Sequence, residues 1–167
     1  MNVHQVNGYG LYALKIFNQE YRRLQAEVDR LTSKAEKLVE EDKVDEAEKI
    51  LSRPAIKLFE AVRFVTLGQV PIDPNSANFR LGKTLGKGYT SWRRVKKMSL
   101  PDRYRLFFRF TSTPPKSIVY AWLNDESTQR KAGSKTDVYN VFKGLLGKGE
   151  IPNSWDELIA AATPLNA

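Results

Sequence analysis

The apolar residues of the first half of the chain recur at steps of three and four positions. Between residues 14 and 38 they form one stripe, which is the period of an amphipathic helix. A second such run begins at Val44, after a charged cluster, so a helical hairpin is expected. Pro54 lacks the amide N–H that a helix interior needs, and we expect it to open a third helix that ends near Gly68. The pattern predicts an all-helical first half.

The second half has the patterning of strands. Residues 92–98 and 103–111 alternate in polarity, and residues 117–124 form a nearly continuous apolar run, as in a buried strand. Short turns separate the three segments and favour an antiparallel meander. Thr136 is expected to cap a closing helix, and Ser154 with Glu157 has the pattern of a capping box. The chain is therefore predicted to be an α+β domain, with N-terminal helices packed on a small antiparallel sheet and helices at the C-terminal end.

The length of 167 residues is that of one domain. We expect a helical part in residues 1–70, a basic sheet with its closing helix in residues 79–150, and a short C-terminal helix and tail in residues 151–167. No apolar run reaches the roughly 18 residues that cross a bilayer, and the first residues lack the pattern of a signal peptide. A cytoplasmic protein with no membrane partner is expected. The absence of cysteine excludes disulfides and thiolate chemistry.

The positive charge of the chain is concentrated in one segment. The net charge is +8 overall, but residues 1–79 carry 11 Lys and Arg against 12 Asp and Glu, whereas residues 80–150 carry 16 against 5. Such a concentration favours a polyanionic partner, above all a nucleic acid. A solvated basic surface is the alternative.

Strand alternation divides this basic segment into two faces. One face of residues 103–110 is apolar, and the other carries Arg103, Arg105, Phe107 and Arg109. If the preceding strand pairs with it, Arg94 and Lys96 join the second face. Like charges on neighbouring strands repel one another, which favours phosphate contact at this face. The alternative to phosphate contact is that the long Arg and Lys side chains lie in solvent and cover Phe107.

The catalytic chemistry open to this segment is limited. His4 is the single histidine, so a histidine acid–base pair is excluded. Asp125 and Glu126 are adjacent and lack metal-ligand spacing, and the glycine-rich residues 82–88 lack the order of a phosphate-binding loop. What remains is a site of Arg, Lys and Tyr without metal or cofactor. Such side chains can bind a phosphodiester, orient a 2′-hydroxyl in line and stabilise the transition state.

Six segments, in order along most of the chain, carry a family resemblance. They are NGYGLYA near the start, FRLGKTLG at 79–86, SWRRVK at 91–96, RYRLFFRF at 103–110, WLNDEST at 122–128 and KTDVYNVFKGLL at 135–146. Together they resemble the YhaV family of toxins, within the RelE/ParE-like superfamily. The resemblance implies a RelE-like fold and ribonuclease activity on messenger RNA, usually at the ribosome. It also implies neutralisation by a PrlF-like antitoxin, whose AbrB-type DNA-binding end would connect the toxin to operator DNA.

The resemblance also implies roles for individual residues. The paired strand cations of RelE resemble Arg94 and Lys96, its transition-state arginine resembles Arg105, and its C-terminal tyrosine resembles Tyr139. Where RelE has a further arginine after the last long strand, this chain has Asn124 and Asp125, so Arg130 is taken as the nearest candidate. Further RNA-binding residues are expected among the neighbouring cations: Arg80, Lys83, Arg93, Lys97, Arg103, Arg109 and Lys135.

The implied reaction is metal-independent and leaves a 2′,3′-cyclic phosphate and a 5′-hydroxyl end. Lys96 would help to deprotonate the 2′-hydroxyl, Arg94 and Arg105 would hold the phosphate, Arg130 would assist the leaving oxygen and Tyr139 would stack on a base. Two other functions remain open. One is a ParE-like poison that binds a protein target without catalysis, and the other is a nucleic-acid-binding co-repressor.

Overall fold

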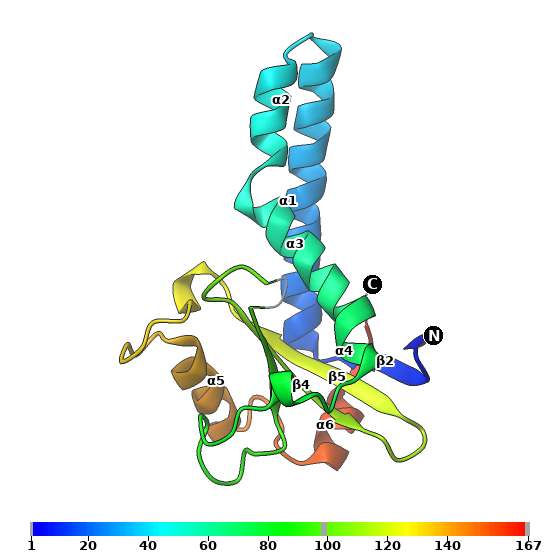
Figure 1. Ribbon diagram of the computed structural model, residues 1–167, viewed down its shortest axis with the longest axis vertical. Coiled ribbons are helices and arrows are strands. Elements are labelled where there is room, and N and C mark those ends of the chain that lie inside the picture. The colour runs from blue at the N-terminus through cyan, green and yellow to red at the C-terminus, as the bar shows by residue number, and fades with distance from the viewer. Residues whose placement is uncertain (1, 98–99, 166–167) are drawn as a thin grey trace.

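A helical hairpin projects away from the sheet (Figure 1). The computed structural model describes residues 2–97 and 100–165. Helix α1 (Lys15–Glu40) begins at the sheet and runs outward, and α2 (Val44–Leu51) returns beside it as a hairpin with its own small core, which includes Leu31 and Ile50. Helix α3 (Pro54–Phe64) then descends to the sheet and continues through a π-helical turn (Val65–Gln69) into α4 (Val70–Ile72).

One mixed sheet connects the two ends of the chain. Its strands are β1 (His4–Val6), β2 (Tyr9–Ala13), β3 (Arg93–Lys96), β4 (Arg105–Thr111), β5 (Ser117–Leu123) and β6 (Thr163–Pro164). The order is β1-β2-β5-β4-β3, with β6 paired to β2. The β2–β5 pair is parallel, and the other pairs within the described residues are antiparallel.

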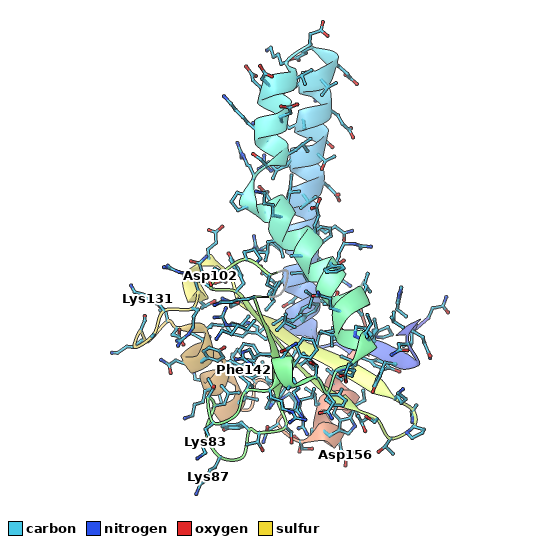
Figure 2. The ribbon with its side chains drawn as sticks, viewed as in Figure 1. Lys83, Lys87, Asp102, Lys131, Phe142 and Asp156 are labelled. Atoms are coloured by element: carbon cyan, nitrogen blue, oxygen red, sulfur yellow. The ribbon has the colours of Figure 1, made fainter. Side chains whose placement is uncertain are left out.

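The two faces of the sheet pack against different helices. Leu106 and Phe108 of β4 pack with α1 and α3 in one core, whereas Phe107 packs with α5 (Val138–Gly147) and α6 (Trp155–Ala161) in a second core. In the second core the Phe107 ring stacks on Phe142 with centroids 3.9 Å apart. Figure 2 shows Phe142 directed inward from α5. Successive β4 residues thus face opposite cores, as strand geometry requires.

The predicted α+β class and the β3–β4–β5 meander are confirmed. The all-helical reading of residues 1–70 is wrong at its start, because β1 and β2 form a hairpin through Asn7 and Gly8 that joins the sheet. The sheet is therefore mixed rather than wholly antiparallel, and the C-terminal tail adds β6 to it.

Several predicted boundaries also shift. The strand expected at 103–111 begins at Arg105, because Arg103 has a φ of +72° that ends extended pairing. The strand expected at 92–98 covers only Arg93–Lys96, and residue 98 lies outside the described part of the chain. Asp137, not Thr136, caps α5, whereas Ser154 caps α6 as expected. The helical course continues past Gly68, through the π-helical turn into α4.

Candidate functional site

The strand register gathers three of the predicted cations on the α5 side of the sheet. Arg94 lies opposite Phe107, and Lys96 lies opposite Arg105. Side chains of directly opposed residues share a face, so Arg94, Lys96 and Arg105 join Phe107 there. Lys96 is exposed and Arg94 is half-buried. The predicted sharing of one face by these three cations is confirmed.

Arg105 is buried rather than displayed on an open surface, with 3% of the residue exposed. Its backbone N–H donates to Oδ1 of the buried Asn124 at 2.8 Å, which fixes the start of β4. Its guanidinium donates from Nη1 to the Tyr104 carbonyl at 2.8 Å and from Nε to the Tyr139 hydroxyl at 3.1 Å. Asn124 also donates from Nδ2 to the carbonyls of Arg103 and Thr128. Sequence analysis noted Asn124 only as a departure from RelE and missed this anchoring role.

The Tyr139 hydroxyl connects the two strands. Its oxygen accepts from Arg105 and also from Nε of Arg94, at 3.0 Å. A phenol oxygen accepts through two lone pairs and donates one proton, so these two bonds use its acceptor capacity and leave its proton for a further acceptor. The Tyr139 ring meets Phe107 edge-on, with centroids 5.9 Å apart, which fixes its position over the sheet.

Arg130 reaches the same tyrosine from the loop before α5. Its guanidinium carbon lies 5.1 Å from the centre of the Tyr139 ring, a cation–π distance. Its Nη1 donates to Oδ1 of Asp137 at 2.7 Å. The structure therefore brings Arg130, the candidate with the weakest sequence support, against the same tyrosine as Arg94 and Arg105.

Asp137 is an anionic member of the site that sequence analysis missed. Its side chain is 4% exposed. Burial raises the pKa of this carboxyl, but hydrogen bonds from Arg130 and from the amides of Lys131 and Tyr139 outweigh burial, so the pKa lies below its ordinary value. Its position just before a helix was the available signal, because Asp is as good an N-cap as Thr.

The remaining predicted RNA-binding residues do not all lie at this site. Arg93 faces the opposite side of β3, with its guanidinium 5.6 Å from the Phe110 ring centre. Arg109 lies beyond Phe107 along β4, over the Trp92 ring, and donates to the Asn153 carbonyl. Burial, followed by a neighbouring arginine, lowers the pKa of both groups. Arg109 therefore shares the predicted face with Arg105 but is held by Trp92 and Asn153, whereas Arg93 lies on the opposite face. RNA binding by these two residues stays a prediction.

The other predicted RNA contacts are exposed, and their role in RNA binding stays a prediction. They are Arg80, Lys83, Lys97, Arg103 and Lys135. The Arg80 carbonyl accepts from Nη1 of Arg94 at 2.6 Å, so the segment before β3 helps to orient that arginine. Figure 2 shows Lys83 and Lys87 directed outward from the loop after Arg80, and Lys131 on the loop that leads to α5.

The arrangement offers several guanidinium donors in one place. The described contacts use two of the five N–H donors of Arg94 and one from the guanidinium of Arg130, so both arginines keep further N–H donors for a ligand. Guanidinium groups match phosphate oxygens through paired N–H donors. Across residues 2–97 and 100–165, no group of three or more His, Asp and Glu side chains is placed to hold a metal ion. Among the same residues, no helix is long and apolar enough to cross a membrane.

Comparison with known proteins agrees with this picture. The model of the YhaV toxin family, described as a toxin with endonuclease activity of a toxin–antitoxin system, matches residues 11–163. The "Ribonuclease toxin YhaV" of Escherichia coli K12 is 39% identical over 155 residues, which cover 92% of each chain. The "Toxin YhaV" of E. coli O6:H1 shows the same identity and coverage. No solved structure was found to match the chain.

Proposed function

We propose that this chain, which belongs to the YhaV family of toxins with endonuclease activity from toxin–antitoxin systems, is a metal-independent endoribonuclease that cuts messenger RNA. It cuts its substrate at the ribosome and so arrests translation. The observation that carries the proposal is the convergence of Arg94, Arg105 and Arg130 on Tyr139, with Lys96 beside them. The name of the E. coli K12 relative supports RNA as the substrate.

The proposed reaction uses the RNA's own nucleophile. The 2′-hydroxyl loses its proton to water, assisted by the nearby positive charge of Lys96, and attacks the adjacent phosphorus, while the bond to the 5′-oxygen breaks. Arg94 and Arg105 stabilise the charge that develops on the phosphoryl oxygens. Arg130 donates a hydrogen bond to the departing 5′-oxygen, which takes up a proton from water. The products are a 2′,3′-cyclic phosphate and a 5′-hydroxyl end.

The geometry favours a different role for Tyr139 from the base stacking expected at first. Its hydroxyl holds Nε of both strand arginines, so we assign it to fixing their relative position. Stacking on a base would require the ring to leave Phe107 and Arg130. Preorganised donors of this kind contribute to catalysis because they need not reorient during the reaction.

The test uses the purified chain with a synthetic RNA, the same RNA with 2′-O-methyl groups, and the RNA in excess EDTA. We expect cleavage of the first, none of the second, and persistence in EDTA, with cyclic phosphate ends by mass spectrometry. Cleavage of the methylated RNA, or complete loss in EDTA, would contradict the mechanism. Comparison of free messenger RNA with translating ribosomes tests the ribosome requirement. Toxicity without cleavage would favour a ParE-like poison, and DNA binding without toxicity a co-repressor.

The proposed partner is a PrlF-like antitoxin with an AbrB-type DNA-binding end, through which operator DNA would join the complex in the cytoplasm. Its toxin-binding segment is expected to be acidic and to cover the face of Arg94, Lys96 and Arg105. An anionic segment there would relieve repulsion between the opposed cations Lys96 and Arg105.

A further inference from the structure

The carboxylate of Asp137 makes contacts beyond those of a helix cap. Oδ2 accepts the backbone N–H of Tyr139 at 3.1 Å, which is the capping bond. Oδ1 accepts from Nη1 of Arg130 at 2.7 Å and from the backbone N–H of Lys131 at 2.5 Å. One side chain thus connects the loop that carries Arg130 with the first turn of the helix that carries Tyr139.

A cap alone requires neither the second oxygen nor the charge. Ser154, which caps α6, meets the need with one hydroxyl that accepts from the Glu157 amide at 3.2 Å. Ser and Asn cap helices about as well as Asp. The contacts that distinguish Asp137 from Ser154 are those to Arg130 and Lys131.

Arg130 is held at three points, and Asp137 supplies the one that orients its charged end. Its backbone N–H donates to the Arg103 carbonyl at 2.9 Å. Its guanidinium lies over the Tyr139 ring, and this contact keeps Arg130 near the tyrosine that Arg94 and Arg105 also contact. The bond to Asp137 restricts rotation about the last side-chain torsions and so fixes the direction of the remaining N–H groups, because a planar guanidinium has a rigid fork of donors.

We propose that Asp137 is a positioning residue of the RNA-cleaving site, which acts by holding the Arg130 guanidinium against Tyr139 and towards the substrate. The inference rests on the proposed ribonuclease function. Asp137 takes no proton and forms no bond in the reaction. Its charge matters because an amide at this position would present an N–H donor to the donors of Arg130 and Lys131.

The test is a double-mutant cycle on RNA cleavage under single-turnover conditions. Asp137→Asn keeps a capping oxygen but loses the charge, and Asp137→Ser keeps the cap but cannot reach Arg130. Each is compared alone and in combination with Arg130→Ala, and Arg130→Ala is also measured alone. The matched control is Ser154→Ala, which removes a cap at a helix outside the site. Thermal melts show that each variant is folded.

We expect Asp137→Asn and Asp137→Ser each to lower the maximal cleavage rate by about 10- to 100-fold, with little change in the protein concentration that gives half of that rate, as a displaced catalytic group would. Neither should lower it further in the Arg130→Ala background, and Ser154→Ala should cleave like the parent. A cleavage rate that is unchanged in both Asp137 variants overturns the proposal. So do losses that multiply with that of Arg130→Ala, because Asp137 then acts independently of Arg130.

A second measurement separates failure of this inference from failure of the proposed function. If the parent does not cleave RNA, the proposed function fails, and the side-chain Nη–H signals of Arg130, the group bonded to Asp137, still report its position in ¹⁵N NMR spectra. A sharp, slowly exchanging signal in the parent that is lost in Asp137→Asn supports positioning by Asp137. The same signal in both overturns it.

Discussion

Replacing Arg105 by alanine should remove most RNA cleavage and leave the chain folded. Arg105 is the most buried cation of the site, and its guanidinium bonds to the Tyr139 hydroxyl and the Tyr104 carbonyl. If it meets charge that develops in the transition state, its loss should lower the turnover rate by about 10²-fold or more, as for a lost oxyanion donor. RNA affinity should weaken less, since exposed cations around the site remain.

The cost to stability follows from the same contacts. The Tyr139 hydroxyl keeps its bond from Arg94, so the loss is closer to one hydrogen bond with a charged donor than to two, about 1.5 to 3 kcal/mol. Removing a cation directly opposite Lys96 returns up to about 1 kcal/mol. The net free energy of unfolding should fall by about 0.5 to 3 kcal/mol. For a chain of this size, that lowers Tm by about 1 to 12 °C.

The assay is single-turnover cleavage of a labelled RNA, with a thermal melt and growth inhibition in bacteria for each variant. Arg63→Ala is the matched control, because Arg63 also donates to a tyrosine hydroxyl, that of Tyr21 at 3.0 Å, but lies on α3 on the other side of the sheet. Arg105→Lys should rescue only partly, since an ammonium cannot reproduce the guanidinium fork. If Arg105→Ala cleaves RNA like Arg63→Ala, the assignment of the active face is wrong.

Three further predictions concern the same site. Tyr139→Phe removes the shared acceptor of Arg94 and Arg105, so it should lower stability by about 1 to 3 kcal/mol and slow cleavage; a melt and a rate that match the parent would refute the positioning role of the hydroxyl. Because the pKa of Asp137 lies below its ordinary value, its ionised form stabilises the fold above about pH 4, and this contribution is lost as the pH falls through the folded-state pKa. Urea midpoints at pH 7 and pH 3 should therefore differ less in Asp137→Asn than in the parent, and an equal difference would contradict the shift. Affinity for the antitoxin should weaken as salt is raised, whereas salt-independent binding by calorimetry would indicate an apolar interface elsewhere.

The elements that a local sequence pattern determines could be predicted. The pairing of strands that lie far apart in the sequence could not. The alternation of residues 103–111 and the apolar run at 117–124 identified β4 and β5, because these strands pair through short connections. The β1–β2 hairpin was missed, although Asn7 and Gly8, with φ of +50° and +82°, have the residue types of a tight hairpin turn. The parallel pairing of β2 with β5 joins segments about a hundred residues apart, and no local period reports it.

The candidate site divides in the same way. Period-two alternation correctly placed Arg94, Lys96 and Arg105 on one face. It does not apply to Arg103, whose left-handed backbone lies before the strand begins. The meeting of Arg130 with Tyr139 depends on the path of residues 124–137, which Asn124 fixes by bonds to the carbonyls of Arg103 and Thr128. Irregular segments held by a side-chain amide carry no periodic signal, so the role of Asn124 could only be found in the structure, whereas Asp137 was open to prediction as a helix cap.

The kinds of acceptor around the cluster help to distinguish a phosphate site from a structural ion-pair network. Among the described contacts, Arg94 and Arg105 are held by a hydroxyl and by carbonyls, which orient a guanidinium without cancelling its charge. Only Arg130 meets a carboxylate there. A network built for stability would pair its cations with anions, because opposed like charges such as Lys96 and Arg105 repel. Here the geometry is fixed and the positive charge is left largely uncompensated, which is the condition under which a polyanion gains the most from binding.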